Sequence, residues 1–99
     1  MSFPNKLSII GREYNVVYSE PTATLMGQCD CDGLKIDIKP GQLLPLEADT
    51  VLHEVIHAIE NSFQLKMNER QVYCMATGLI AVFKNNPDFL EYMYKAIKQ

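Results

Sequence analysis

The pattern of hydrophobic and polar positions changes once along the chain, near Pro40. Before this proline, apolar residues alternate with polar ones, which is the period of a β-strand with one buried face. The clearest case is residues 34–39, in which three apolar residues alternate with three charged ones. After Pro40 the apolar residues recur every three or four positions, as they do in amphipathic helices. The pattern therefore predicts strands first and helices afterwards.

Two hairpins are predicted before Pro40. Residues 7–20 contain two short runs rich in β-branched and aromatic residues, separated by a turn at Gly11-Arg12. Residues 25–39 contain a second pair of runs, for which Asp32-Gly33 supplies the turn. We expect a sheet of three or four mostly antiparallel strands.

Three helices are predicted after Pro40. The first runs from about Leu46 to Ser62, because its apolar residues form one stripe. Asn68 caps the second, with Gln71 three residues later as in a capping box, and Asn86 precedes a third that has proline in its first turn. The apolar residues expected to face the core are Val72, Met75, Ala76, Leu79 and Phe83 on the second helix and Phe89, Leu90, Met93 and Ile97 on the third. Strands followed by helices predict one α+β domain covering residues 1–99.

The composition is that of an ordinary globular domain. Of the 99 residues, 47% are hydrophobic and 21% are charged, and the net charge of -3 lacks the basic surplus of nucleic-acid-binding proteins. No apolar run reaches the roughly 18 residues of a membrane span, and no secretory signal is recognisable. We therefore expect a cytoplasmic protein with no nucleic-acid or membrane partner. Its three cysteines are expected to be reduced thiols.

Both histidines of the chain lie in the sequence HEVIH at residues 53–57. On an α-helix, residues four apart have Cβ atoms roughly 5–6 Å apart, so His53 and His57 can offer ring nitrogens to one ion. A zinc–nitrogen bond of about 2.0–2.1 Å fits this gap. The alternative is a pair of surface histidines that bind nothing. Shuffling the same composition reproduces the pattern roughly once or twice per thousand, which favours a metal site.

Glu54, directly after the first histidine, makes the pair typical of a hydrolytic enzyme. Zinc in an open site lowers the pKa of bound water to about 7, and a neighbouring carboxylate can then accept the proton. In the H-E-x-x-H pattern the glutamate is the general base and not a ligand. The sequence thus predicts Glu54 as the catalytic residue.

A catalytic zinc usually has three protein ligands, so the third must come from elsewhere in the chain. Glu60 shares a face with both histidines, but it lies about 10 Å along the helix axis from His53. It stays open as a weaker alternative, or as a residue that orients His57. Glu69 is better placed, because it begins the second helix on the inward side, where a carboxylate is costly unless paired or metal-bound. The alternative for Glu69 is a favourable interaction with the helix dipole alone.

Cys29 and Cys31 form a further candidate pair. Two thiolates can bind zinc, but strand residues two apart share a face and usually pack, and no second Cys/His pair completes a site. We interpret both, together with Cys74, as packing residues. Tyr73, one turn beyond Glu69, is the candidate to donate a hydrogen bond to the oxyanion of a tetrahedral intermediate.

The stretch TVLHEVIHAIENSF (50–63), followed by NERQVYCMATGLIAVFKNNPDF (68–89), resembles the small phage and prophage metallopeptidases of the ImmA/IrrE type and, more broadly, minimal gluzincins. A weaker resemblance extends to the hairpins. It implies a zincin-like fold in which His53, His57 and Glu69 hold zinc and Glu54 is the base. The second helix is similar to the E-x-x-A-N-x-F-A helix of these proteins. Here Val72 and Tyr73 replace Ala-Asn, so a role of that Asn does not carry over.

The resemblance also implies a mode of substrate binding. An edge strand of the sheet lies above the zinc helix and pairs with an extended peptide, and here that strand is expected to be Leu34–Lys39. The expected function is that of a zinc metalloendopeptidase acting on a peptide or protein substrate. The alternative is a non-enzymatic phage protein that keeps zinc for stability or for binding a partner. No feature of the sequence predicts an oligomeric state.

Overall fold

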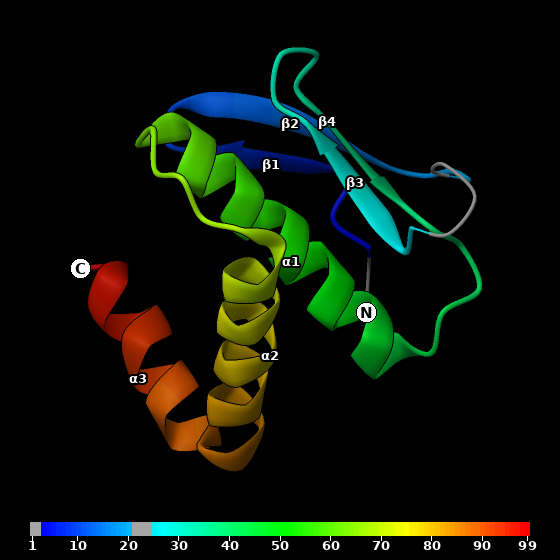
Figure 1. Cartoon of the computed structure of the whole chain (residues 1–99). Helices are drawn as coiled ribbons and strands as arrows, with labels where there is room; N and C mark the ends of the chain where they lie inside the picture. Colours follow the sequence, from blue (N-terminus) through cyan, green and yellow to red (C-terminus); the bar gives the residue numbers. More distant parts are fainter. Residues whose placement is uncertain (1–2, 21–24) are drawn as a thin grey trace.

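The computed structural model describes residues 3–20 and 25–99, which form a sheet and three helices (Figure 1). The strands are β1 (Lys6–Ile9), β2 (Arg12–Tyr18), β3 (Gly27–Asp30) and β4 (Lys35–Ile38). The helices are α1 (Leu44–Ser62), α2 (Glu69–Asn85) and α3 (Pro87–Ile97). The predicted α+β layout, with strands first and three helices afterwards, is confirmed.

The four strands form one mixed sheet in the order β1-β2-β4-β3. The two hairpins, β1/β2 and β3/β4, are antiparallel, and β2 pairs with β4 in parallel. The expectation that Leu34–Lys39 is an edge strand is wrong, because β4 lies inside the sheet and β3 forms the edge. The alternation of residues 34–39 indicates which face is buried, but it carries no information about which strands lie on either side.

The turns of the hairpins show how local backbone geometry sets the register. Ile10 and Gly11 both have positive φ, at 47° and 77°, as the two central residues of a type I′ turn require. This turn therefore lies one residue earlier than predicted. In the second hairpin the Asp30 side chain accepts hydrogen bonds from the main-chain N–H groups of Asp32 and Gly33 at 3.1 and 2.9 Å. The predicted turn at Asp32-Gly33 is confirmed.

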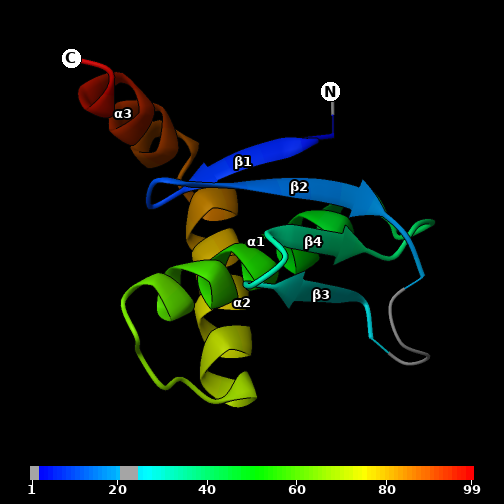
Figure 2. The same ribbon diagram turned by 90° about the horizontal axis from the view of Figure 1, so that it is seen from above.

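Helix α1 runs across one face of the sheet (Figures 1 and 2). The core between them consists of Ile9, Tyr14, Val16, Ile36, Ile38 and Ala58, with Val51, Val55 and Ile59 of α1 packed against it. Because this apolar stripe faces the sheet, the histidines at its margin lie beside the sheet and not under it. Of the stripe expected on α1, Val55 and Ile59 face the sheet and Leu52 and Ile56 face α2, so these four are confirmed as inward. Phe63, expected to continue the stripe, is 60% exposed, so that part of the expectation is wrong.

Helix α2 folds back and packs on α1 through a second cluster, which consists of Ile56, Val72 and Ala76 with Leu52, Met67 and Leu79 around them. The predicted capping box is confirmed. The Asn68 side chain accepts from the Gln71 N–H at 2.8 Å, and the Gln71 side chain accepts from the Asn68 N–H at 2.9 Å. This reciprocal pair fixes the first turn of α2, which begins at Glu69.

Helix α3 begins at Pro87, as predicted, but it does not face a core. The expectation that Phe89, Leu90, Met93 and Ile97 are buried is wrong, since each is at least 37% exposed. Met75 of α2, also expected in the core, is half exposed. Periodicity shows that a helix has an apolar face, but not whether the fold provides anything to cover it. None of the described helices combines the length and hydropathy that a membrane span requires.

Candidate metal centre

His53, His57 and Glu69 come together where α1 and α2 meet. One potential ligand atom from each residue lies within 4.8 Å of the others. Glu69 Oε1 is 2.6 Å from His57 Nε2, and Glu69 Oε2 is 3.2 Å from His53 Nε2. The two imidazole rings have centroids 4.9 Å apart. The structure therefore brings together the three residues that the sequence predicted as metal ligands.

The positions of these residues follow from the elements that carry them. The two histidines project from the same side of α1, one helical turn apart. Glu69 is the first residue of α2, directly after the Asn68 cap. Packing of Val72 against Ile56 brings the start of α2 back beside the histidines. The group therefore depends on the spacing of the two histidines, on the cap that begins α2 and on the packing of α2 against α1.

The donor set suits a metal ion, and its atoms, which are spread over up to 4.8 Å, would have to move closer together to bind one. Four ligands at about 2.0–2.1 Å in a tetrahedral arrangement lie roughly 3.3 Å from one another. The distance from His53 to Glu69 already matches this value, whereas the distance from His57 to Glu69 is shorter and would have to open slightly. The side chain of Glu69 is 76% exposed, so little packing resists this movement. Two imidazoles and a carboxylate leave a fourth position for water.

Glu60 lies on the opposite side of the His57 ring from Glu69. Its Oε1 atom is 2.8 Å from His57 Nδ1, and its Oε2 atom accepts a hydrogen bond from the Met67 N–H at 2.7 Å. Both carboxylate oxygens of Glu60 are therefore engaged away from the candidate metal centre. Of the two roles that the sequence left open for this residue, the geometry favours orienting His57 over binding the ion.

Glu54 is buried between α1 and β3, with 5% of the residue exposed. A methyl group at Gly27 would lie 3.0 Å from Glu54 Oε2 and 2.7 Å from Thr50 Cγ2, so the absent side chain of Gly27 leaves the space for this carboxylate. Burial raises the pKa of Glu54 to about 7, and the charge of Glu69 adds to the rise while His57 opposes it. A cation at the candidate metal centre would lower this pKa, because it favours the charged carboxylate.

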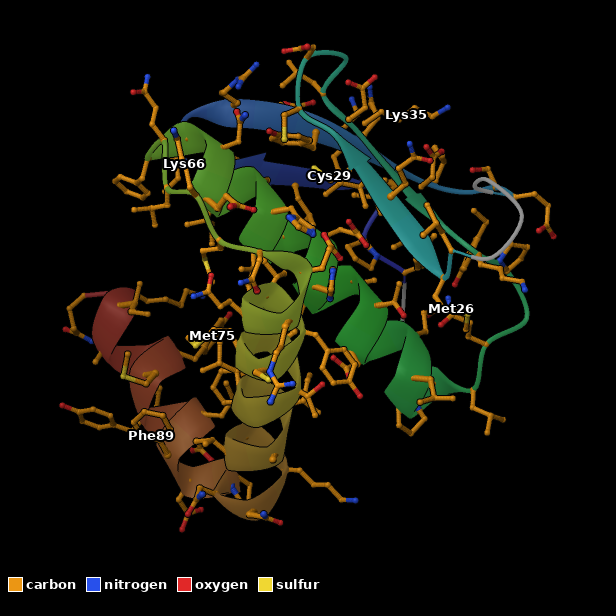
Figure 3. All side chains as sticks on the ribbon, viewed as in Figure 1. Met26, Cys29, Lys35, Lys66, Met75 and Phe89 are labelled. Atoms are coloured by element: carbon orange, nitrogen blue, oxygen red, sulfur yellow. The ribbon has the colours of Figure 1, made fainter. Side chains whose placement is uncertain are left out.

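A groove with a volume of about 940 Å³ opens over the candidate metal centre. It is bounded by β3, α1, the link at residues 63–68 and the start of α2. Met26, directly before β3, and Lys66, in the link, both line it and lie far apart in Figure 3. His53, Glu54, His57 and Glu69 all line the groove, together with the apolar residues Leu25, Met26, Leu46 and Leu65. A ligand in the groove would meet the carboxylate and the metal ligands together.

Strand β3 directs a free main-chain edge into this groove. Its other edge pairs with β4, and the Met26 carbonyl accepts from the Lys39 N–H at 2.9 Å. Main-chain groups of successive strand residues point to opposite edges, so Gly27 and Cys29 direct their N–H and C=O groups away from β4. Among the strands that the structure describes, none pairs with this edge.

The remaining candidates have different environments. Tyr73 lines the groove and is 60% exposed. The Sγ atoms of Cys29 and Cys31 are 3.6 Å apart, and burial raises the pKa of the Cys29 thiol. Within the described residues no third metal ligand joins them, and Cys29 packs against the core as expected. Cys74 is exposed, so its predicted packing role is wrong.

Gly27 is the residue of the site that the sequence analysis missed. Glycine inside a strand pattern can indicate a close approach by another part of the chain, and this was the available signal. Glu54, which packs against Gly27, is far away in the sequence, so the glycine alone could not identify the residue that lies against it.

No protein-family model matches the chain, and searches of curated proteins and of solved structures found nothing similar to it. The resemblance to small phage metallopeptidases therefore stays a prediction from the motifs. What points to a function is the geometry of the His53, His57 and Glu69 group and of the groove above it.

Proposed function

We propose that the protein is a zinc-dependent metallopeptidase with a zincin-like arrangement, in which His53, His57 and Glu69 hold the ion. The observation that carries the proposal is the convergence of these three residues from two helices on a groove that Glu54 also lines. Imidazole and carboxylate ligands suit zinc, and three protein ligands with one open position are typical of its catalytic sites.

Glu54 is the general base of this proposal. When bound, zinc supplies a Lewis acid that makes water more acidic and polarises a carbonyl group. Glu54 accepts the proton of the attacking water and then passes it to the nitrogen of the leaving amine. Its buried position against Gly27 holds the carboxylate in one place. Tyr73 is the candidate donor to the negative charge that develops on the carbonyl oxygen.

The free edge of β3 is the proposed binding site for the peptide. An extended substrate would pair with the main-chain groups of Gly27 and Cys29, and its scissile bond would lie over the floor of the groove. The role that the resemblance implied for Leu34–Lys39 thus passes to Gly27–Asp30. Main-chain pairing favours extended peptides and disfavours folded domains as substrates.

The test compares the wild type with Glu54→Gln, after purification without chelators. The wild type is expected to contain about one zinc per chain and to cleave members of a peptide library. Glu54→Gln should keep the zinc and lose at least about 100-fold in cleavage rate, because the amide cannot accept the proton. Cleavage by Glu54→Gln at the wild-type rate would refute the assignment of the base.

A second candidate function is zinc binding without catalysis. The position of Glu69 on α2 favours this function. An ion bound by Glu69 and by the two histidines of α1 would link the two helices. Such an ion contributes to folding stability whether or not it is catalytic. Stoichiometric zinc with no cleavage of any library member would favour this function over the peptidase.

A further inference from the structure

Helix α3 is hardly covered by the rest of the chain. All of its 11 residues are exposed, and in the part of the chain that the structure describes it contacts α2 alone. Figures 1 and 2 show it projecting from the body formed by the sheet and α1. Isolated helices shorter than about 12–15 residues are marginal in water. Because α3 is short and touches only one other element, its own chain gives it little support.

The uncovered surface of α3 is strongly amphipathic. Phe89, Leu90, Met93 and Ile97 lie on one side when residues are placed at about 100° intervals, and they are 37–74% exposed. The charged residues Asp88, Glu91 and Lys95 of this helix, and Lys98 directly after it, lie on the opposite side. The apolar side therefore carries no charge that would require water.

Helix α2 extends the same surface. Met75 and Val82 are 50% and 42% exposed, and Figure 3 shows Met75 on the side of α2 that faces α3. We call these six residues, Met75, Val82, Phe89, Leu90, Met93 and Ile97, the α2–α3 apolar face. None of them lines the groove of the candidate metal centre. A protein bound to this face would leave the groove open.

The size of the α2–α3 apolar face matches an interface between two proteins of this size. Its exposed fractions correspond to an apolar area on the order of 500 Å². A standard interface buries about 800 Å² on each partner, and about 65% of a homodimer interface is apolar. The face thus supplies nearly all of the apolar area that a stable dimer needs.

We propose that two copies of this chain bind each other through the α2–α3 apolar face, so that the two helical hairpins form a four-helix bundle. A symmetric interface uses the same surface on both chains and must be complementary to itself. Large side chains project from α3, whereas Gly78 on α2 has open space above it, next to Met75 and Val82. Residues of one α3 fill that space on the other chain.

Charge does not oppose this pairing. Each chain carries a net charge of -3, but the face itself is uncharged, and the two acidic residues on the far side of α3 are balanced by Lys95 and by Lys98 directly after the helix. A second copy of the chain therefore meets no charge repulsion at this contact. A charged partner, by contrast, would find no group of opposite charge on the face. The dimer is independent of the proposed peptidase function.

The test measures molar mass by sedimentation velocity, from micromolar to millimolar chain concentrations. The wild type is expected to show twice the mass of one chain. Ile97→Asp should raise the dissociation constant at least about 30-fold, because it places a charge at the most exposed residue of the apolar face. The matched control is Tyr92→Asp. Tyr92 is an aromatic residue of α3 that is 65% exposed and lies outside the apolar face, so this variant should stay dimeric.

A second measurement needs no substitution. Amide hydrogen exchange of α3 in the wild type should slow as the chain concentration rises, because dimerisation covers the helix. A wild type that stays monomeric at every concentration would overturn the proposal. So would an Ile97→Asp variant that dimerises as tightly as wild type, or exchange of α3 that does not depend on concentration.

Discussion

The Oε1 atom of Glu60 lies 2.8 Å from the Nδ1 atom of His57. If His57 binds an ion through Nε2, the ring proton has to lie on Nδ1, where it can be donated to Glu60, because an ionised carboxylate can only accept a hydrogen bond. The second oxygen of Glu60 holds the main chain at Met67, two residues before Glu69. One carboxylate therefore connects His57 to the start of the helix that carries Glu69, the third candidate ligand.

Replacing Glu60 by Gln is expected to weaken zinc binding about 10- to 100-fold without removing a ligand. The amide has one accepting oxygen where the carboxylate has two, so either His57 or Met67 loses its partner. Competition with a chromophoric chelator measures the affinity. The control is Glu47→Gln, also on α1. The Glu47 side chain contacts Tyr18 and not a histidine. Equal affinities for wild type and Glu60→Gln would show that His57 needs no such partner.

The ligand substitutions are expected to differ in severity. His53→Ala combined with His57→Ala should abolish stoichiometric zinc, because only the carboxylate of Glu69 is left. Glu69→Ala should reduce the affinity but keep measurable binding through the two histidines, which are held one turn apart by α1. Metal content after dialysis distinguishes the two cases. Zinc that persists in the double histidine variant would place the ion elsewhere.

Removal of the metal is expected to destabilise the packing of α2 on α1. An ion bound by the folded state alone stabilises it by about 4 kcal/mol when its free concentration is about 1,000 times the dissociation constant. Thermal unfolding with and without a chelator measures the difference. In Glu69→Ala the chelator should have a smaller effect, since the ion no longer joins the two helices. An unchanged melting temperature in the wild type would contradict this role.

Gly27→Ala is expected to destabilise the protein by about 1–3 kcal/mol, because the added methyl group overlaps Thr50 and approaches Glu54. It should also lower cleavage by displacing the carboxylate of Glu54. Gly78→Ala is the matched control in the monomeric chain, since open space surrounds that position within one chain. There the same substitution in a helix should stabilise by roughly 0.5–1 kcal/mol. Chemical denaturation of dilute protein measures both, and equal effects would mean that Gly27 is not tightly packed.

The sequence by itself determined the elements and the local part of the site. The capping box at Asn68, the proline that begins α3 and the alternation of residues 34–39 are all confirmed. So is the placement of His53 and His57 on one side of a helix. Each of these features depends on contacts between residues at most four positions apart, which the order of residues records directly.

Only the tertiary structure decided how the elements meet. It placed β3 and not β4 at the edge of the sheet, Gly27 against Glu54, and Glu69 rather than Glu60 beside both histidines. It also left α3 without a core to cover it. These outcomes depend on contacts between segments distant in the sequence. Local periodicity shows that a strand or helix has an apolar face, but not which segment packs against it.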